Sequence, residues 1–271
     1  MIIIKISGGL GNQMFQYALY KELLYQGKKC NMDKISYLND SFGREYCLDV
    51  FPNIKIDFCN KVESVFYRTI GKLNKSYYLE NEALSFDKNI FEIDKGFISG
   101  CFQNEEYFKD VKEKVVDDFL FSINAKDILD ISSKIKDDKG STSIHIRGND
   151  YLKLNDRYGN ICTKEYYQKA ISIIEEKIDN PHFYIFSDDM KYAETLLEGH
   201  DYTVLDKKEG YKDYYDMFLM SQCSHNIIAN SSFSFWGSYL NKNKDKIIVC
   251  PKKWDNKFEN KKVYCDGWIA L

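Results

Sequence analysis

The sequence predicts an α/β protein built on doubly wound parallel sheets. In its second half, short apolar strands alternate with amphipathic helices, an order that favours parallel strand pairing. The chain also opens with an apolar strand, a glycine-rich turn and a helix. The 271 residues, of which 44% are hydrophobic, suffice for one large domain or two ordinary domains with a substantial core.

Composition narrows the classes of function. The net charge of −3 gives no reason to expect nucleic acid or an anionic membrane as the main partner. The eight cysteines are scattered singly without a Cys-x-x-Cys pair, which favours buried free thiols over a disulfide framework or a zinc site. The first apolar run is too short for a signal peptide, and no later run approaches a membrane span. These features predict a cytoplasmic protein.

The first predicted strand, residues 2–6, runs into a glycine-rich turn and a helix expected at about 14–26. Such a turn presents backbone N–H groups to an anion. It is not a dinucleotide-binding fingerprint, because no third glycine follows Gly11 at the required spacing. Asn12 and Gln13 would place two amide side chains at the mouth of the turn. The alternative is a tight turn that Asn12 merely caps.

The middle of the chain is harder to interpret. Residues 30–96 show few clear periods and are expected to be rich in loops with short helices. A strand is predicted at 96–103, followed by helices at 107–119 and near 127–136. The charged, glycine-containing stretch 137–140 is the predicted domain boundary.

The second half is more regular. Strands are predicted at 141–146, 182–186, 202–205, 226–229 and 247–250, with helices after each of the first four. Three of these strands end in polar clusters, at His145 and Arg147, at Asp188 and Asp189, and at Ser231 and Ser232. In open parallel sheets, the carboxyl ends of the strands are where ligands bind. The three clusters therefore predict one site at one edge.

The residue types in these clusters suit a diphosphate. The guanidinium of Arg147 matches phosphate oxygens in a bidentate fork. Ser231 and Ser232, at a helix entrance, supply hydroxyl and N–H donors. Asp188 or Asp189 can accept from a ribose or a guanine edge, and the alternative for this pair is a helix N-cap.

Two other side chains near the predicted site are open to two interpretations. His145 could be a core histidine, but its position two residues before Arg147 favours the site. Phe233, Phe235 and Trp236 are more often core anchors than stacking platforms, so packing is favoured.

Taken together, the residues suit the binding of a nucleotide diphosphate. The sequence holds neither a P-loop lysine motif nor a convincing Asp-x-Asp loop for a metal. A diphosphate leaving group neutralised by arginine and helix donors, without Mg²⁺, is one way to transfer a sugar through an oxocarbenium-like transition state.

Four motifs together resemble the bacterial α-1,2-fucosyltransferases of glycosyltransferase family 11. Shorter stretches at 100–105 and 165–167 are similar to the family too, and the resemblance spans residues 1 to about 255 in the right order. The motifs are Gly8-Gly9-Leu10-Gly11-Asn12-Gln13-Met14-Phe15-Gln16-Tyr17-Ala18, His145-Ile146-Arg147-Gly148-Asn149-Asp150-Tyr151, Phe186-Ser187-Asp188-Asp189 and Asn230-Ser231-Ser232-Phe233-Ser234-Phe235-Trp236-Gly237.

The resemblance implies a GT-B-like fold in which two Rossmann-type domains face each other across a cleft. Residues 1–138 would form an N-terminal domain on the acceptor side. Residues 139–271 would form the donor domain, with a tail that could pack back on the first domain. The implied reaction moves L-fucose from GDP-β-L-fucose to the 2-hydroxyl of a terminal β-galactoside, with inversion and without a metal or other cofactor.

The resemblance also implies roles for individual residues. Arg147 would contact the donor diphosphate, and His145 would lie beside it. Asp150 is a candidate base for the acceptor hydroxyl, and the alternative is that it orients Arg147. The donor-binding set would be Gly11, Asn12, Gln13, Asp188, Asp189, Ser231, Ser232 and Phe233.

One departure from the family pattern concerns the residue after Arg147. The family usually has a second arginine there, whereas this chain has Gly148, which puts donor affinity in question and raises Arg157 or a lysine as a substitute.

The expected protein is a cytoplasmic enzyme, able to sit peripherally at the inner membrane face, that decorates an O-antigen or another surface glycan. Its partners would be GDP-fucose and a galactose-terminated acceptor, with no nucleic acid. Two alternatives remain: a glycosyltransferase that uses another GDP-sugar, and a catalytically silent module that binds GDP or a glycan.

Overall fold

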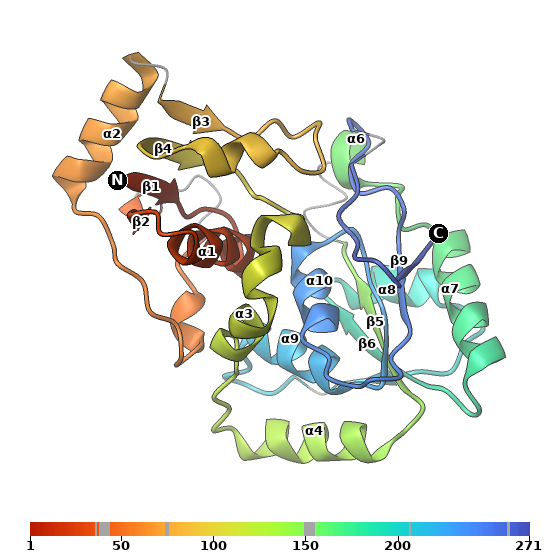
Figure 1. The fold of residues 1–271 in the computed structure, drawn as a ribbon. Helices are drawn as coiled ribbons and strands as arrows, with labels where there is room; N and C mark the ends of the chain where they lie inside the picture. Colours follow the sequence, from red (N-terminus) through yellow and green to blue (C-terminus); the bar gives the residue numbers. More distant parts are fainter. Residues whose placement is uncertain (36, 38–43, 74–75, 149–154, 206, 259–260) are drawn as a thin grey trace. The chain divides into compact units, whose positions relative to one another are not determined.

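The chain folds into two compact units, Met1–Ser122 and Ile123–Leu271. Figure 1 shows the computed structural model, which describes all residues except 36, 38–43, 74–75, 149–154, 206 and 259–260. Each unit is built on its own sheet, and every strand pair is parallel. The prediction of two α/β domains is confirmed.

The first unit holds a four-stranded sheet in the order β2-β1-β4-β3. The chain leaves β1 through α1 to the outer strand β2, and returns through α2 to the opposite edge at β3. Right-handed connections in opposite directions place the two helices on opposite faces of the sheet. The elements are β1 (Ile2–Lys5), α1 (Leu10–Tyr25), β2 (Cys30–Asp33), η2 (Leu48–Val50), α2 (Lys61–Leu73), β3 (Tyr77–Leu79), η3 (Lys88–Glu92), β4 (Gly96–Ser99), η4 (Glu105–Val111) and α3 (Lys112–Asp118).

Two predicted helices of the first unit differ from the structure. Helix α1 begins at Leu10, because Gly8 takes a φ of +79° and lets the chain turn at once into an N-cap at Gly9. Asn12 is therefore a helical residue and not the cap. The helix expected at 107–119 is divided at Val111, whose φ and ψ angles of −122° and 15° separate η4 from α3, and η4 itself is kinked at Phe108.

The second unit holds a six-stranded sheet in the order β10-β9-β8-β5-β6-β7. The predicted central strand, Ser141–Ile146, is found with the expected bounds and is buried throughout. The elements are α4 (Lys126–Asp137), β5 (Ser141–Ile146), α6 (Asn155–Tyr158), α7 (Lys164–Lys177), β6 (His182–Ser187), α8 (Met190–Leu196), β7 (Thr203–Val204), α9 (Asp213–Gln222), β8 (His225–Ile227), α10 (Ser232–Tyr239), β9 (Ile248–Cys250) and β10 (Ile269–Ala270).

Strand β5 has two different faces because successive side chains of a strand point to opposite sides. Ile144 and Ile146 join the core formed with α7 and α8. His145 points to the other side, where its ring lies 5.8 Å from that of Phe233 in α10. Figure 1 shows α9 and α10 on one side of β5 and β6, and α7 and α8 on the other.

The second unit starts earlier in the chain than predicted, and the C-terminal tail forms part of its sheet. Helix α4 was expected in the first domain, but it packs against α9 and so belongs to the second unit. The tail, for which packing on the first domain was considered, contributes β10, which pairs with β9 in the second sheet.

Candidate active site at the carboxyl edge of the second sheet

Three neighbouring strands of the second sheet deliver polar residues to the same edge. Strand β5 lies between β6 and β8, and Ile144 is in register with both Ile185 and Ile227. Arg147 follows β5, Asp188 follows β6, and Ser231 follows β8 by a few residues. The predicted meeting of the three clusters at one edge is therefore confirmed.

Arg147 is held by Asp188. An Nη1 atom of Arg147 lies 2.9 Å from Oδ2 of Asp188, and about a quarter of each side chain is exposed (24% and 25%). The other carboxylate oxygen of Asp188 accepts the backbone N–H of Gly148 at 2.8 Å. The guanidinium is thus a fixed and accessible positive charge at the sheet edge.

The two adjacent aspartates have different tasks. Asp189 is the N-cap of α8, and its carboxylate accepts the backbone N–H of Tyr192 at 3.1 Å. The N-cap interpretation considered for this pair therefore applies to Asp189, whereas Asp188 faces Arg147. Sequence alone could not separate them, because both follow the same strand.

Gly148 packs closely against Asp189, the N-cap of α8. A Cβ atom at this position would lie 2.5 Å from the Cβ of Asp189, well inside any normal contact. A second arginine after Arg147 would therefore require α8 or its cap to shift.

The cations considered as substitutes for a second arginine form ion pairs with other residues. Arg157 contacts the buried carboxylate of Asp255 at 2.7 Å, and Lys207 contacts Asp216 at 2.6 Å.

His145 is buried, with 4% of its surface exposed. Burial lowers its pKa well below the usual value, and the positive charges of Arg147 and Lys207 lower it further. The imidazole is therefore neutral near pH 7. Its Nδ1 atom has no hydrogen-bond partner among the described residues. His145 thus combines the buried position considered from sequence with a place beside Arg147.

Helix α10 begins at the third strand end. Ser231 is its N-cap and accepts the backbone N–H of Phe233 at 3.3 Å. Ser232, the first helical residue, is only partly buried and so leaves a hydroxyl near the helix N-terminus. Phe235 and Trp236 are fully buried, as favoured from sequence.

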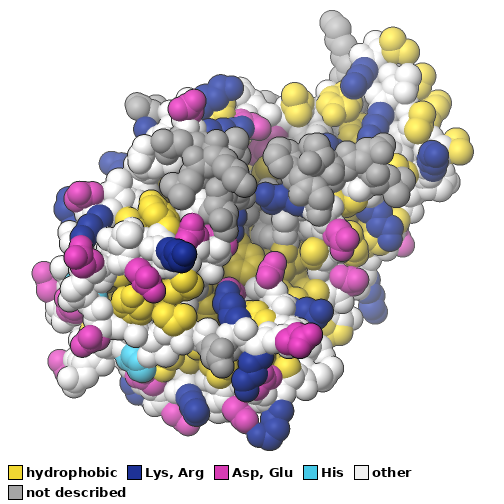
Figure 2. Space-filling model, turned by 180° about the vertical axis from the view of Figure 1, so that it is seen from behind, with side chains coloured by type: hydrophobic (Ala, Val, Ile, Leu, Met, Phe, Trp, Pro, Cys, Tyr) yellow, Lys and Arg dark blue, Asp and Glu magenta, His cyan; other side chains and the backbone are white. Residues whose placement is uncertain are grey.

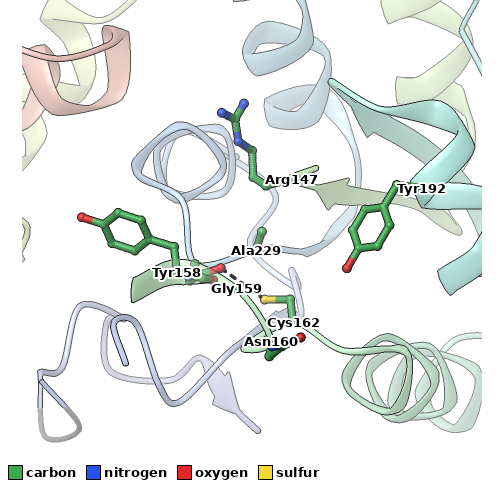
Figure 3. Close-up of a pocket in the computed structure, with 8 residues that line it drawn as sticks. Arg147, Tyr158, Gly159, Asn160, Cys162, Tyr192 and Ala229 are labelled. Carbon is green, nitrogen blue, oxygen red and sulfur yellow. Dashed lines mark hydrogen bonds between the residues drawn. The ribbon is translucent and has the colours of Figure 1, made fainter. Parts of the chain in front are cut away.

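A small pocket opens beside Arg147, and most of its lining was not predicted. Its lining consists of Arg147, Tyr158, Gly159, Asn160, Cys162, Tyr192, Ala229 and Asn230. Figure 3 shows Tyr158 and Tyr192 on opposite sides of the pocket. Asn230 could have been singled out from sequence, because it directly precedes the predicted Ser231.

Cys162 is the one thiol in this pocket. Its Sγ lies 3.6 Å from Oδ1 of Asn230, and burial raises its pKa to about 12. It therefore stays a thiol at neutral pH and is not an activated nucleophile.

The first unit brings its own predicted residues to the carboxyl edge of its sheet. Oδ1 of Asn12, which is partly exposed, accepts a hydrogen bond from the amide of Gln103 at 2.8 Å, joining the ends of β1 and β4. Gln13 has no exposed surface. Its amide binds the carbonyls of Gly8 and Glu45 and the N–H of Cys47. Of these three residues of α1, Asn12 alone is partly exposed at the mouth of the turn, because Gly11 and Gln13 are buried.

Asp150, the candidate base, lies outside the described residues. Within the described part of the chain, no cluster of three or more His, Cys, Asp or Glu side chains could hold a metal ion. No described helix is both long and apolar enough to cross a bilayer.

Comparisons with known proteins agree with the motifs. The profile described as Glycosyl transferase family 11 matches residues 1–271. The Escherichia coli O-antigen biosynthesis glycosyltransferase WbnK is 32% identical over 98% of this chain and 99% of its own length. An E. coli alpha-1,2-colitosyltransferase is 31% identical over 94% of this chain and 92% of its own length.

Two further similarities have lower coverage or lower identity. A galactoside alpha-(1,2)-fucosyltransferase 1 of Rattus norvegicus is 30% identical over 36% of this chain and 27% of its own length. Among solved structures, NodZ alpha-1,6-fucosyltransferase soaked with GDP-fucose is 14% identical, with a TM-score of 0.47 over 88% of this chain and 92% of that chain.

Proposed function

Because the chain belongs to glycosyl transferase family 11, we propose that it transfers L-fucose from GDP-β-L-fucose to the 2-hydroxyl of a terminal β-galactoside. The transfer inverts the configuration at the fucose anomeric carbon. The observation that carries this proposal is Arg147, fixed by Asp188 at the sheet edge where parallel α/β sheets bind ligands. The named relatives support transfer to a 2-hydroxyl, since two of them are alpha-1,2-transferases.

The second unit supplies groups for the leaving diphosphate. As the bond between the anomeric carbon and the phosphate oxygen breaks, negative charge builds up on the diphosphate. The guanidinium of Arg147 neutralises part of that charge through paired hydrogen bonds. The helix N-terminus at the start of α10 and the hydroxyl of Ser232 add further favourable contacts for an anion. These donors stabilise the leaving group without a metal ion.

The acceptor hydroxyl attacks from the face opposite the diphosphate, which inverts the anomeric centre. Its proton must pass to a base as the new bond forms, and Asp150 is the candidate for this role. His145 is neutral and buried. We therefore propose that it supports the end of β5 by packing and does not neutralise the diphosphate.

A second donor has a specific observation in its favour. The alpha-1,2-colitosyltransferase covers almost the whole chain at 31% identity. GDP-colitose is therefore the alternative donor, with the same site and the same direction of transfer. The O-antigen context of the relative WbnK makes a surface glycan the proposed acceptor class.

The test is GDP release measured in EDTA, with GDP-fucose, GDP-colitose and GDP-mannose as donors. Lactose and a β-1,3-linked galactoside serve as acceptors, and NMR of the product identifies the linkage and the anomeric configuration. Arg147→Ala and Arg147→Lys are compared with the wild type, because lysine keeps the charge and loses the fork. We expect acceptor-dependent release with GDP-fucose that falls at least about a hundredfold in Arg147→Ala and less in Arg147→Lys.

Other outcomes have clear meanings. Release with GDP-colitose alone would replace the fucose donor by colitose. Binding of GDP without turnover on any donor and acceptor would favour the silent binding module. Loss of all activity in EDTA, with recovery on adding a divalent cation, would contradict the metal-free mechanism.

A further inference from the structure

Helix α2 exposes an apolar stripe to solvent. Val62, Val65, Phe66 and Leu73 are 78%, 55%, 51% and 73% exposed. With 3.6 residues per turn, these positions fall on one face of the helix. The helix thus presents four large apolar side chains on its outer surface, with the exposed Thr69 between Phe66 and Leu73.

The inward face of α2 is held largely by polar contacts. Ser64 donates to Oδ2 of the buried Asp33 at 2.8 Å, and Arg68 contacts the same oxygen at 2.6 Å. The Arg68 guanidinium also lies over the ring of Phe97, 5.1 Å from its centre. Tyr67 adds an apolar contact with the core of the sheet. The apolar stripe is therefore not needed to attach α2 to the sheet.

The charges around the stripe are predominantly basic. Lys61 and Lys72 are exposed and lie along one flank of the stripe on the helical wheel. The one acidic residue of α2, Glu63, accepts the backbone N–H of Asn60 at 2.9 Å, and Asn60 accepts the N–H of Glu63 in return. This reciprocal cap occupies Glu63 at the helix start. Figure 2 shows hydrophobic and Lys or Arg side chains side by side at the upper right of the view, where α2 lies.

We propose that α2 docks the first unit on an anionic lipid surface. Its apolar stripe enters the boundary between headgroups and acyl chains, and Lys61 and Lys72 contact lipid phosphates. Surface-bound amphipathic helices combine these two features, an apolar face and flanking lysines. This inference goes beyond the proposed reaction and would stand if the donor or the acceptor proved different.

A second copy of the chain fits the stripe less well. A helix of 13 residues is about 20 Å long, so a stripe about 10 Å wide offers roughly 200 Å². Stable dimers bury roughly 800 Å² on each partner. Pairing two such stripes would also bring like-charged lysines together, whereas an anionic surface attracts them.

The experiment measures co-sedimentation of the full chain with vesicles of phosphatidylglycerol and phosphatidylcholine, and with vesicles of phosphatidylcholine alone. We expect binding to the anionic vesicles that weakens as salt is raised. Val65→Ser combined with Phe66→Ser should lower binding at least about tenfold, because two apolar groups no longer leave water. Lys61→Glu combined with Lys72→Glu should have a similar effect, since each lysine contributes about fivefold.

The matched control is Leu129→Ser combined with Val204→Ser, two side chains of the second unit that are 43% and 47% exposed. It should leave vesicle binding unchanged, as the effect belongs to α2 and not to apolar surface in general. All variants should keep the wild-type circular dichroism and its activity on a soluble acceptor. Phe66→Trp should show a blue-shifted emission with anionic vesicles.

Three results would overturn the proposal. The first is a wild-type chain that does not sediment with anionic vesicles. The second is an α2 variant that sediments as well as the wild type. The third is a wild-type dimer in light scattering that the Val65→Ser and Phe66→Ser changes convert to a monomer, which would make the stripe an interface between copies.

Discussion

Arg147 and Asp188 form an ion pair of 2.9 Å whose carboxylate also accepts the backbone N–H of Gly148. Asp188 thus fixes both the guanidinium and the backbone that carries it. The carboxylate of the neighbouring Asp189 instead accepts the backbone N–H of Tyr192 at the start of its own helix. The roles of these two aspartates, which are adjacent in sequence, can therefore be distinguished by experiment.

Asp188→Asn is expected to lower kcat/KM for the donor about tenfold, chiefly through KM, because Arg147 loses the charge that orients it. Stability should change little, since exposed ion pairs contribute at most about 1 kcal/mol. The control is Asp189→Asn, which should be nearly silent because asparagine is an equally good N-cap. Steady-state kinetics with varied donor concentration, measured on both variants, tests these expectations. An unchanged or lower donor KM in Asp188→Asn would mean that Asp188 competes with the diphosphate.

Gly148→Ala is expected to destabilise the protein by about 1–3 kcal/mol, because the new Cβ would lie 2.5 Å from the Cβ of Asp189. Thermal unfolding measures this loss. Gly71→Ala in α2 is the matched control, since its Cβ would meet neighbours at an ordinary 3.5 Å. Alanine within a helix should there be neutral or slightly stabilising. Equal melting temperatures for wild type and Gly148→Ala would show that α8 adjusts freely.

Stability is expected to fall as the pH drops below about 6.5, the ordinary pKa of histidine. Burial lowers the pKa of both His145 and His225 in the folded state. The unfolded chain therefore binds protons first, and acid favours unfolding. The loss should reach about 1 kcal/mol per pH unit for each histidine. Urea unfolding between pH 7 and 5 measures it.

His145→Gln and His225→Gln should each flatten part of this pH dependence, because neither amide titrates. The combined variant should flatten it most. If neither substitution changes the slope of unfolding free energy against pH, the titrating group is not one of these two histidines.

Arg68→Ala is expected to lower the free energy of unfolding by about 2–4 kcal/mol. The fully buried carboxylate of Asp33 would lose its cation and, among the described residues, keep the hydroxyl of Ser64 and the N–H of Ile35. Adding Asp33→Asn to Arg68→Ala should recover part of the loss, because the buried charge is then gone. Urea unfolding of both variants checks this. No loss in Arg68→Ala would mean that α2 is held by its apolar contacts alone.

The sequence by itself determined the main strands of the second unit and the meeting of their polar ends at one edge. Apolar strands followed at once by Arg147, Asp188 and Ser231 can be recognised locally, and the alternation with helices implies parallel strands. Parallel strands bring their carboxyl ends to one edge, so the meeting of these residues follows from geometry. The same reasoning found β5 with its bounds.

Other features depended on contacts between residues far apart in the chain. Only packing assigned α4 to the second unit and closed Gly148 against Asp189. It also buried Gln13 against the carbonyl of Glu45.

Helix α2 shows the physical limit most clearly. Val62, Val65 and Phe66 have helical spacing, a signal that could have located this helix within the stretch 30–96. Periodicity reports that a helix has an apolar face, but not where that face points. Asp33 holds the inward face through Ser64 and Arg68, so the apolar face is left outside. The net charge of −3, summed over the chain, likewise conceals the two lysines beside that face.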